Sequence, residues 1–179
     1  MNYDVIGIAA TDNEGYIAKE NKQGKLMPIL KNIENKYDEA IDYYYLRSVM
    51  MECILNYDGV IGVMGENTYE QMKTMNLVSK MADVVVSDTN TRNLKTRVLN
   101  SIYKKGICKN MCALILGGKS VYNTFINEYD TFYHIQYNRP IGKRQKSIQN
   151  LIDHHLSKTH LKEHEKIMPE NFTIVKYYK

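Results

Sequence analysis

Short apolar runs separated by longer amphipathic stretches dominate this chain. Several runs are compact and rich in branched aliphatic residues, which is typical of strands buried in a sheet. They cover residues 5–10, 60–64, 82–87, 113–116 and 131–137. Residues 16–18 form a further short extended piece, and the alternating pattern over residues 172–178 predicts a final strand.

Helical patterns lie between these strands. Residues 35–55 contain no Pro or Gly and carry one apolar face at helical spacing. That face is formed by Ile41, Tyr45, Leu46 and Val49. Further helices are predicted over residues 68–75, 94–103 and 121–126. Helices that alternate with short apolar strands predict an α/β fold, with a mostly parallel central sheet and helices on both of its faces.

Two polar stretches interrupt this pattern. Residues 19–25 contain Gly24 and predict a mobile loop that ends at Pro28. Residues 154–166 are polar and form either a helix or a loop. Because the last strand follows this long polar stretch, we expect it to run antiparallel at the C-terminal edge of the sheet. The 179 residues show no internal repeat, and they fit a single domain over residues 1–179.

The composition is that of an ordinary globular protein, with 44% hydrophobic and 25% charged residues. The net charge of +4 is modest, and one small basic cluster at Lys143, Arg144 and Lys146 does not favour nucleic-acid binding. No apolar run is long enough to cross a bilayer, and the N-terminus lacks a signal-peptide pattern. The sequence therefore predicts a cytoplasmic monomer or small homo-oligomer without nucleic-acid or membrane partners.

Metal ligation is not predicted. The three cysteines cannot all pair with one another, so we expect free thiols. Cys108 and Cys112 have no second pair to complete a zinc site, and Cys112 opens an apolar run as a small core residue. His160 and His164 lie four residues apart on a candidate helix, but no set of carboxylates or thiols completes a site around them.

A double glycine is the strongest indication of a binding site. Gly117 and Gly118 follow a predicted buried strand directly and precede a predicted helix. Glycines at this point let the backbone approach a ligand closely, and they open amide donors at a helix N-terminus, where a phosphate is stabilised. A plain tight turn accounts for the same residues equally well.

Two further strand ends carry small or hydroxyl residues. One strand leads through Gly65 into a helix whose start holds Asn67 and Thr68, and Ser87 ends the next strand. Three such ends at one edge of an open sheet fit a nucleotide laid across the carboxyl ends of the strands. The chain has no G-x-G-x-x-G fingerprint of the common dinucleotide-binding fold.

Asp42 is the candidate acid of this site. It follows Ile41 directly and lies beside the apolar face of the helix over residues 35–55. A partly buried carboxylate at this position would bind a protonated or amidine-like ring. An ordinary solvent-facing acid fits the same pattern.

Taken together, these residues resemble the dihydrofolate reductase family over most of the chain. The matching segments, in the order of the family, are Ile8-Ala9-Ala10, Ile17-Ala18, Met27-Pro28, Asp42, Met64-Gly65-Glu66-Asn67-Thr68, Val86-Ser87 and Gly117-Gly118 with Val121-Tyr122. In that family they form the first strand, the mobile active-site loop and its end, the active-site acid, the cofactor-phosphate motif, the strand end near the adenosine phosphate, and the motif beside the nicotinamide. The chain is also rich in Lys, Asn, Tyr and Ile, as is typical of the AT-rich genomes of some viruses and bacteria.

The resemblance implies an enzyme that reduces 7,8-dihydrofolate to tetrahydrofolate by hydride transfer from NADPH. Asp42 would bind the pterin and favour protonation of its neighbouring ring nitrogen. The substrate would also contact Ile8, Ala9, Leu46, Leu116 and Tyr122. The cofactor would contact Ala10, Ile17, Gly65, Asn67, Thr68, Ser87, Gly117, Gly118, Lys119, Ser120 and Val121.

The chain departs from the family pattern around the substrate. Ile29 follows Pro28 where the family has Trp, and no Trp occurs anywhere in the chain. Glu34 stands at the spacing that the acid has in shorter members, so it is a rival to Asp42. The Arg expected for the folate tail has no match, since Lys80 and a methionine stand there. A catalytically inactive protein with a binding or structural role is therefore an alternative, and so is a pterin or pyrimidine reductase like that of the riboflavin pathway.

Two carboxylates bear on the choice of cofactor. Glu66 stands where the family has Arg or Lys, and Asp88 follows Ser87 where a neutral or basic residue is usual. Each would repel a 2′-phosphate by about 1 kcal/mol if it is solvated. Use of NADH, weak cofactor binding, or no cofactor binding at all is therefore an alternative to NADPH.

Overall fold

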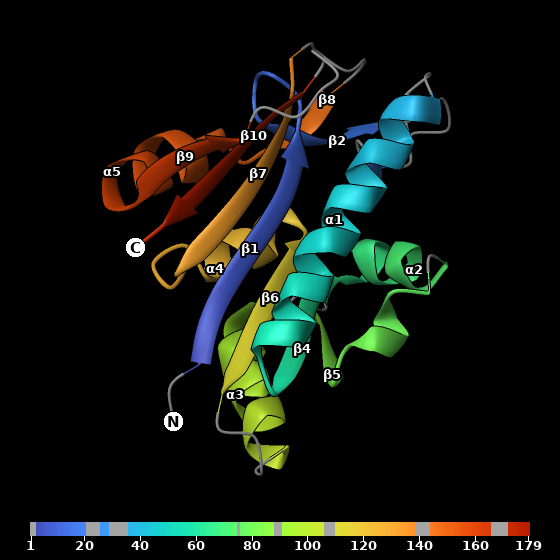
Figure 1. Ribbon diagram of the computed structural model, residues 1–179, viewed down its shortest axis with the longest axis vertical. Helices are drawn as coiled ribbons and strands as arrows, with labels where there is room; N and C mark the ends of the chain where they lie inside the picture. Colours follow the sequence, from blue (N-terminus) through green and yellow to red (C-terminus); the bar gives the residue numbers. More distant parts are fainter. Residues whose placement is uncertain are drawn as a thin grey trace. The chain divides into compact units, whose positions relative to one another are not determined.

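The computed structural model describes residues 3–20, 26–28, 36–74, 76–87, 91–105, 110–138, 144–165 and 172–179. In chain order, its elements are β1 (Tyr3–Thr11), β2 (Tyr16–Glu20), β3 (Leu26–Pro28), α1 (Lys36–Asn56), β4 (Gly59–Gly65), α2 (Glu66–Thr74), the 3₁₀ helix η2 (Val78–Lys80), β5 (Asp83–Ser87), the 3₁₀ helix η3 (Thr91–Asn93), α3 (Leu94–Lys104), β6 (Met111–Gly117), α4 (Lys119–Thr124), β7 (Thr131–Tyr137), β8 (Arg144–Ser147), the π-helical turn η4 (Leu151–Leu156), α5 (Ser157–Thr159), β9 (Leu161–Glu165) and β10 (Phe172–Tyr178) (Figure 1).

These elements group into two compact units. Unit 1 holds residues 1–7 and 47–130, and unit 2 holds residues 8–46 and 131–179. The assignment of residues 1–179 to one domain stays a prediction.

Within the described residues, the main sheet has the strand order β5-β4-β6-β1-β7-β10-β9. The first five residues of β1 pair in parallel with β6, and β4 runs parallel to both β5 and β6. In contrast, β10 is antiparallel to both β7 and β9. The predicted mostly parallel sheet with an antiparallel C-terminal edge is therefore confirmed.

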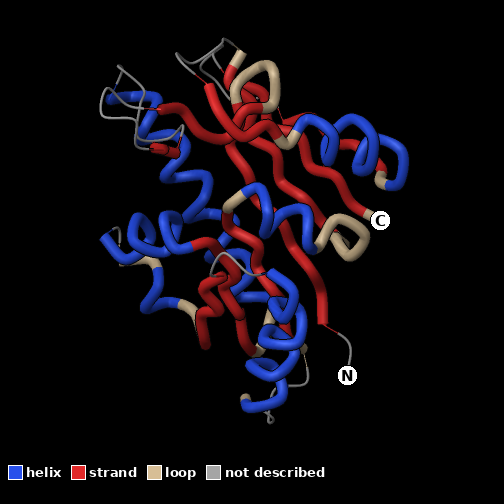
Figure 2. Tube along the Cα trace, turned by 180° about the vertical axis from the view of Figure 1, so that it is seen from behind, coloured by secondary structure: helices blue, strands red, loops and turns tan. Residues whose placement is uncertain are grey.

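Unit 1 is a parallel sheet covered by helices. Its central strands, β4 and β6, are buried along almost their whole length, as expected for strands covered on both faces. The part of α1 from Arg47 onward lies on one face of these strands, and α3 and α4 lie on the other (Figures 1 and 2). Leu94, Val98 and Ile102 recur every four residues and form the buried stripe of α3.

Unit 2 is built from antiparallel pairings. The strands β7, β10 and β9 are neighbours in the main sheet, and β3, β2 and β8 form a separate antiparallel sheet. Gly15 makes the turn before β2 with φ +78, and its carbonyl accepts a hydrogen bond of 2.8 Å from the Ile148 amide. Tyr137 and Phe172 pack edge to face across the β7–β10 pair, with ring centroids 4.6 Å apart.

Three sequence-based assignments were wrong, all in unit 2. Lys19 and Glu20, which were expected in a loop, belong to β2, and residues 26–28 form β3. The stretch over residues 154–166 was expected to be a helix or loop, but its second half contains β9. The side chains of Leu161, Lys162 and Glu163 are exposed. A strand at the edge of a sheet does not need apolar residues at alternate positions, so no strand pattern is visible in this sequence. Residues 21–25, the rest of the expected loop, lie outside the described residues.

Among the helices that the structure describes, none is long and apolar enough to span a bilayer.

Candidate functional site

Three strand ends of unit 1 lie at one edge of its sheet. Gly65, the last residue of β4, pairs with Ser87, the last residue of β5. On the other side of β4, Met64 pairs with Gly117, the last residue of β6. The β4–β6 register shifts between Val63 and Met64, which is the irregularity expected of a β-bulge. The predicted convergence of Gly65, Ser87 and Gly117 is therefore found.

Gly117, the last residue of β6, and Gly118, which follows it, are glycines for different physical reasons. A Cβ atom on Gly117 would lie only 2.6 Å from Thr68 Oγ1 and 3.0 Å from Thr68 Cγ2, so the backbone there packs directly against the side chain of Thr68 in α2. Gly118 has φ +89, a conformation that other residues rarely adopt. A Cβ atom on Gly118 would lie 3.9 Å from Gly65 Cα and 3.5 Å from Val121 Cγ2. The β6–α4 and β4–α2 junctions are thus packed together through their backbones.

Two helices begin at this edge. Helix α2 begins at Glu66 directly after β4, and α4 begins at Lys119 after the glycine pair. The side chains of Asn67, Lys119 and Ser120 are exposed, whereas Ser87 and Val121 are buried. The first-turn amides of α2 have no partner within a helix, and their aligned dipoles favour an anion. Glu66, in the same turn, opposes that preference.

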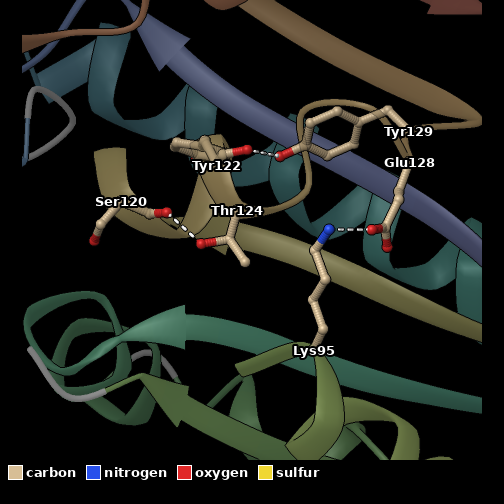
Figure 3. A network of polar contacts seen from close by, with 6 residues as sticks. All are labelled: Lys95, Ser120, Tyr122, Thr124, Glu128 and Tyr129. Atoms are coloured by element: carbon tan, nitrogen blue, oxygen red, sulfur yellow. Dashed lines mark hydrogen bonds and ion pairs between the residues drawn. The ribbon is translucent and has the colours of Figure 1, made fainter. Parts of the chain in front are cut away.

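A network of polar contacts holds the segment after the glycine pair (Figure 3). The Tyr129 hydroxyl donates a hydrogen bond of 3.1 Å to the Tyr122 carbonyl, and Thr124 Oγ1 donates one of 2.8 Å to the Ser120 carbonyl. Lys95 of α3 forms an ion pair with Glu128. The edge of the site that α4 provides is thereby anchored to the neighbouring helix.

The predicted residue Tyr122 lies inside this network. Its side chain is only 3% exposed, and burial raises the pKa of its phenol above the ordinary value. Leu116, also predicted to contact substrate, is buried in β6. Tyr122 and Leu116 therefore shape the edge of the site from within the core of unit 1.

Arg97 was not identified from the sequence. It lies in the first turn of α3, and its Nη2 atom donates a hydrogen bond of 2.9 Å to the carbonyl of Val86, one residue before the end of β5. Its side chain is exposed, so a cation stands beside the strand end that holds Ser87. The position is off the apolar stripe of its helix, but any exposed Arg shares that feature, so the sequence carries no specific signal for it.

The remaining predicted residues belong to unit 2. Ile8, Ala9 and Leu46 are buried, and Ala10 and Ile17 are half-buried. Helix α1 carries the backbone of Asp42 in its second turn, while the Asp42 side chain lies outside the described part of the structure. The rival acid Glu34 and the carboxylate Asp88 also lie outside the described residues.

A buried polar pair in unit 2 was also missed. Thr11 Oγ1 donates a hydrogen bond of 2.8 Å to the Asp12 carbonyl, so its short contact of 2.7 Å with His134 Nε2 must use the imidazole as donor. The Nδ1 atom of His134 is then an unprotonated acceptor, and it is buried without a hydrogen-bond partner among the described residues. Burial lowers the pKa of His134 to about 4, so the ring is neutral at physiological pH.

The described residues contain no group of three or more His, Cys, Asp or Glu side chains that could hold a metal ion. The rings of His155 and His160 lie 6.3 Å apart between centroids, and the side chain of His164 lies outside the described ones.

One solved structure similar to this chain is dihydrofolate reductase from Enterococcus faecalis complexed with NADP(H) and RAB-propyl. The TM-score is 0.61 at 16% sequence identity, and the match covers 98% of this chain and 95% of that chain. No family model matches the sequence. No curated protein matches it either. A likeness at this identity shows the fold alone, and the mostly parallel sheet with an antiparallel C-terminal edge is a dihydrofolate reductase-like fold.

Proposed function

We propose that this chain is an oxidoreductase of the dihydrofolate reductase type, which reduces 7,8-dihydrofolate to tetrahydrofolate with NADPH. The observation that carries the proposal is the contact between Gly117, at the end of β6, and Thr68, in the first turn of α2 after β4. It brings two backbone turns together at the carboxyl edge of a parallel sheet, where nucleotides bind in open α/β folds. The similar solved structure, which contains NADP(H), supports the same reading.

The residues of unit 1 fit a dinucleotide. Amides at the start of α2 and the Thr68 hydroxyl would hold the phosphates. The lack of a side chain at Gly117 lets the end of β6 lie directly against Thr68, so that the two proposed phosphate-binding turns are close together. The other candidate cofactor contacts of unit 1 are Gly65, Asn67, Ser87, Lys119, Ser120 and Val121.

Arg97 favours NADPH over NADH in this proposal. Its guanidinium is fixed by one hydrogen bond to Val86 and retains further N–H donors for an anion. For a 2′-phosphate at the end of β5, attraction by the Arg97 charge would offset repulsion by the Glu66 carboxylate. The cation would therefore offset Glu66, one of the two carboxylates that the sequence sets against NADPH.

The substrate role of unit 2 rests on the resemblance. Asp42 would bind the amino group and ring N–H of the pterin and so favour protonation of the neighbouring ring nitrogen, which makes the accepting carbon more electrophilic. Leu46 would pack on the pterin or the benzoyl ring, and Ile8 and Ala9 are the other candidate substrate contacts of unit 2. The cofactor supplies the hydride, and the protein supplies position and charge.

A turnover assay tests the proposal. Purified protein is mixed with dihydrofolate and with either NADPH or NADH, and the loss of reduced-nicotinamide absorbance is followed. We expect turnover that is faster with NADPH, and a rise in the unfolding temperature with methotrexate. Absence of turnover with both cofactors, together with no thermal shift, would reject the enzyme and favour the second candidate, a dihydrofolate reductase-like protein with a binding or structural role. The exposed Glu66 at the start of α2 is the observation that favours this second candidate.

A further inference from the structure

Two thiols face each other inside unit 1. Cys53 lies in α1 and Cys112 in β6; both are free, and 2% and 0% of their surfaces are exposed. The two thiols are joined by a side-chain hydrogen bond. This contact links a helix to a central strand, at positions far apart in the sequence.

Independent contacts fix α1 above β6 at this point. Tyr57 follows Cys53 by one helical turn and donates its amide to the Cys53 carbonyl at 3.0 Å. The Tyr57 hydroxyl donates a hydrogen bond of 2.5 Å to Asp4 Oδ2, and Asp4 pairs with Cys112 in the register of β1 and β6. The end of α1 is therefore held over the strand position that carries Cys112.

We propose that Cys53 and Cys112 are a reversible redox pair, which closes to a disulfide between α1 and β6 when a hydroperoxide oxidises it. The proposal is independent of the proposed reductase function, because the pair lies near the amino ends of β1 and β6 and the nucleotide edge lies at the carboxyl ends of the strands.

The two thiols have unequal roles in this reaction. The hydrogen bond from Cys112 lowers the pKa of Cys53, while the same bond and burial raise the pKa of Cys112 above the ordinary thiol value. In this proposal Cys53 attacks first and Cys112 resolves the intermediate.

The chemistry balances with one hydroperoxide. The Cys53 thiolate attacks a peroxide oxygen, so that an S–O bond forms, the O–O bond breaks, and water leaves after protonation. Cys112 then attacks the Cys53 sulfur of the sulfenic acid, so that the S–S bond forms and a second water leaves. Two thiols lose two electrons in total, and hydrogen peroxide is reduced to two water molecules.

Burial sets the rate of this reaction. A peroxide reaches Cys53 only when the last turns of α1 open locally, so we expect slow oxidation of the native protein and faster oxidation in mild denaturant. Once formed, the disulfide closes a loop of about sixty residues, and we expect the unfolding temperature to rise by about 5–10 °C.

The test uses the full chain with Cys108→Ser, which removes the third thiol. The protein is incubated with hydrogen peroxide, and its remaining thiols are alkylated under denaturing conditions before mass analysis. We expect a species that has lost two hydrogen atoms and takes up no alkylating agent, with one peptide link between Cys53 and Cys112. Dithiothreitol should restore both thiols and the original unfolding temperature.

Matched variants complete the test. Cys53→Ser and Cys112→Ser, each in the Cys108→Ser background, should form no link and show no rise in unfolding temperature with peroxide. If a serine variant does not fold, the mass analysis of the parent protein decides alone. Two free thiols after prolonged peroxide treatment in mild denaturant, or a Cys53 that stops at the sulfinic acid, would overturn the proposal.

Discussion

The buried imidazole of His134 predicts a specific loss of stability in acid. The pKa of His134 is lowered from 6.5 to about 4 by burial, so the unfolded chain takes up this proton at a higher pH than the folded protein does. The contribution of His134 is therefore complete above pH 6.5, is lost as the pH falls from 6.5 to 4, and changes no further below that. Each pKa unit is worth about 1.4 kcal/mol, so the full loss is about 3 kcal/mol, of which about 2 kcal/mol has gone by pH 5.

The perturbation is His134→Gln, which keeps a donor toward Thr11 Oγ1 and cannot become charged in this pH range. The free energy of unfolding is measured by urea titration at several pH values, with circular dichroism as the probe. Between pH 7.5 and pH 5 the wild-type protein should lose about 2 kcal/mol more than the variant, because the carboxylates that titrate in this range are common to both. His154→Gln, at an exposed histidine of the same unit, is the matched control variant. Parallel profiles for wild type and His134→Gln would refute the reasoning.

Three further predictions concern the nucleotide edge and the acid. Gly117→Ala should destabilise the protein by about 1–3 kcal/mol and weaken NADPH binding, because its Cβ atom would meet Thr68 Oγ1 at 2.6 Å; addition of Thr68→Ala should recover much of the stability in urea titrations. Arg97→Gln should weaken NADPH binding by about 10-fold and leave NADH binding unchanged in fluorescence titrations, and equal losses for the two cofactors would contradict a contact with the 2′-phosphate. Asp42→Asn should lower the turnover of dihydrofolate by about 100-fold or more while Glu34→Gln does not, and the reverse ranking in the same assay would make Glu34 the acid.

Burial on both faces is the reason why the central strands were predictable. The strands β4 and β6 are covered on both faces, so their sequences are continuous apolar runs that few other structures produce. Helix α1 was equally clear from its long stretch without Pro or Gly. The strand β9 was missed because its exposed edge position allows the sequence LKEHE, which has the composition of a loop.

The candidate site was predictable only where the backbone demands particular residues. The glycine pair stands out because Gly118 needs a positive φ and Gly117 needs to lack a side chain beside Thr68. In contrast, Arg97 owes its place to a hydrogen bond with Val86, and His134, which burial keeps neutral, has its hydrogen-bond contact with Thr11. Those partners lie 11 and 123 positions away along the chain, and no local pattern encodes such a contact.

The division of the chain into units determines where the protein can be divided into fragments. Two of the three boundaries fall inside elements, in β1 between Gly7 and Ile8 and in α1 between Leu46 and Arg47, and the third precedes β7. Neither unit is a continuous segment, so expression of either one as a fragment would leave a severed strand and half a helix with broken backbone hydrogen bonds. Any split version of this protein, for example a two-fragment reporter, is best cut in a connection between elements, since a cut at the unit boundary removes hydrogen bonds that both halves need.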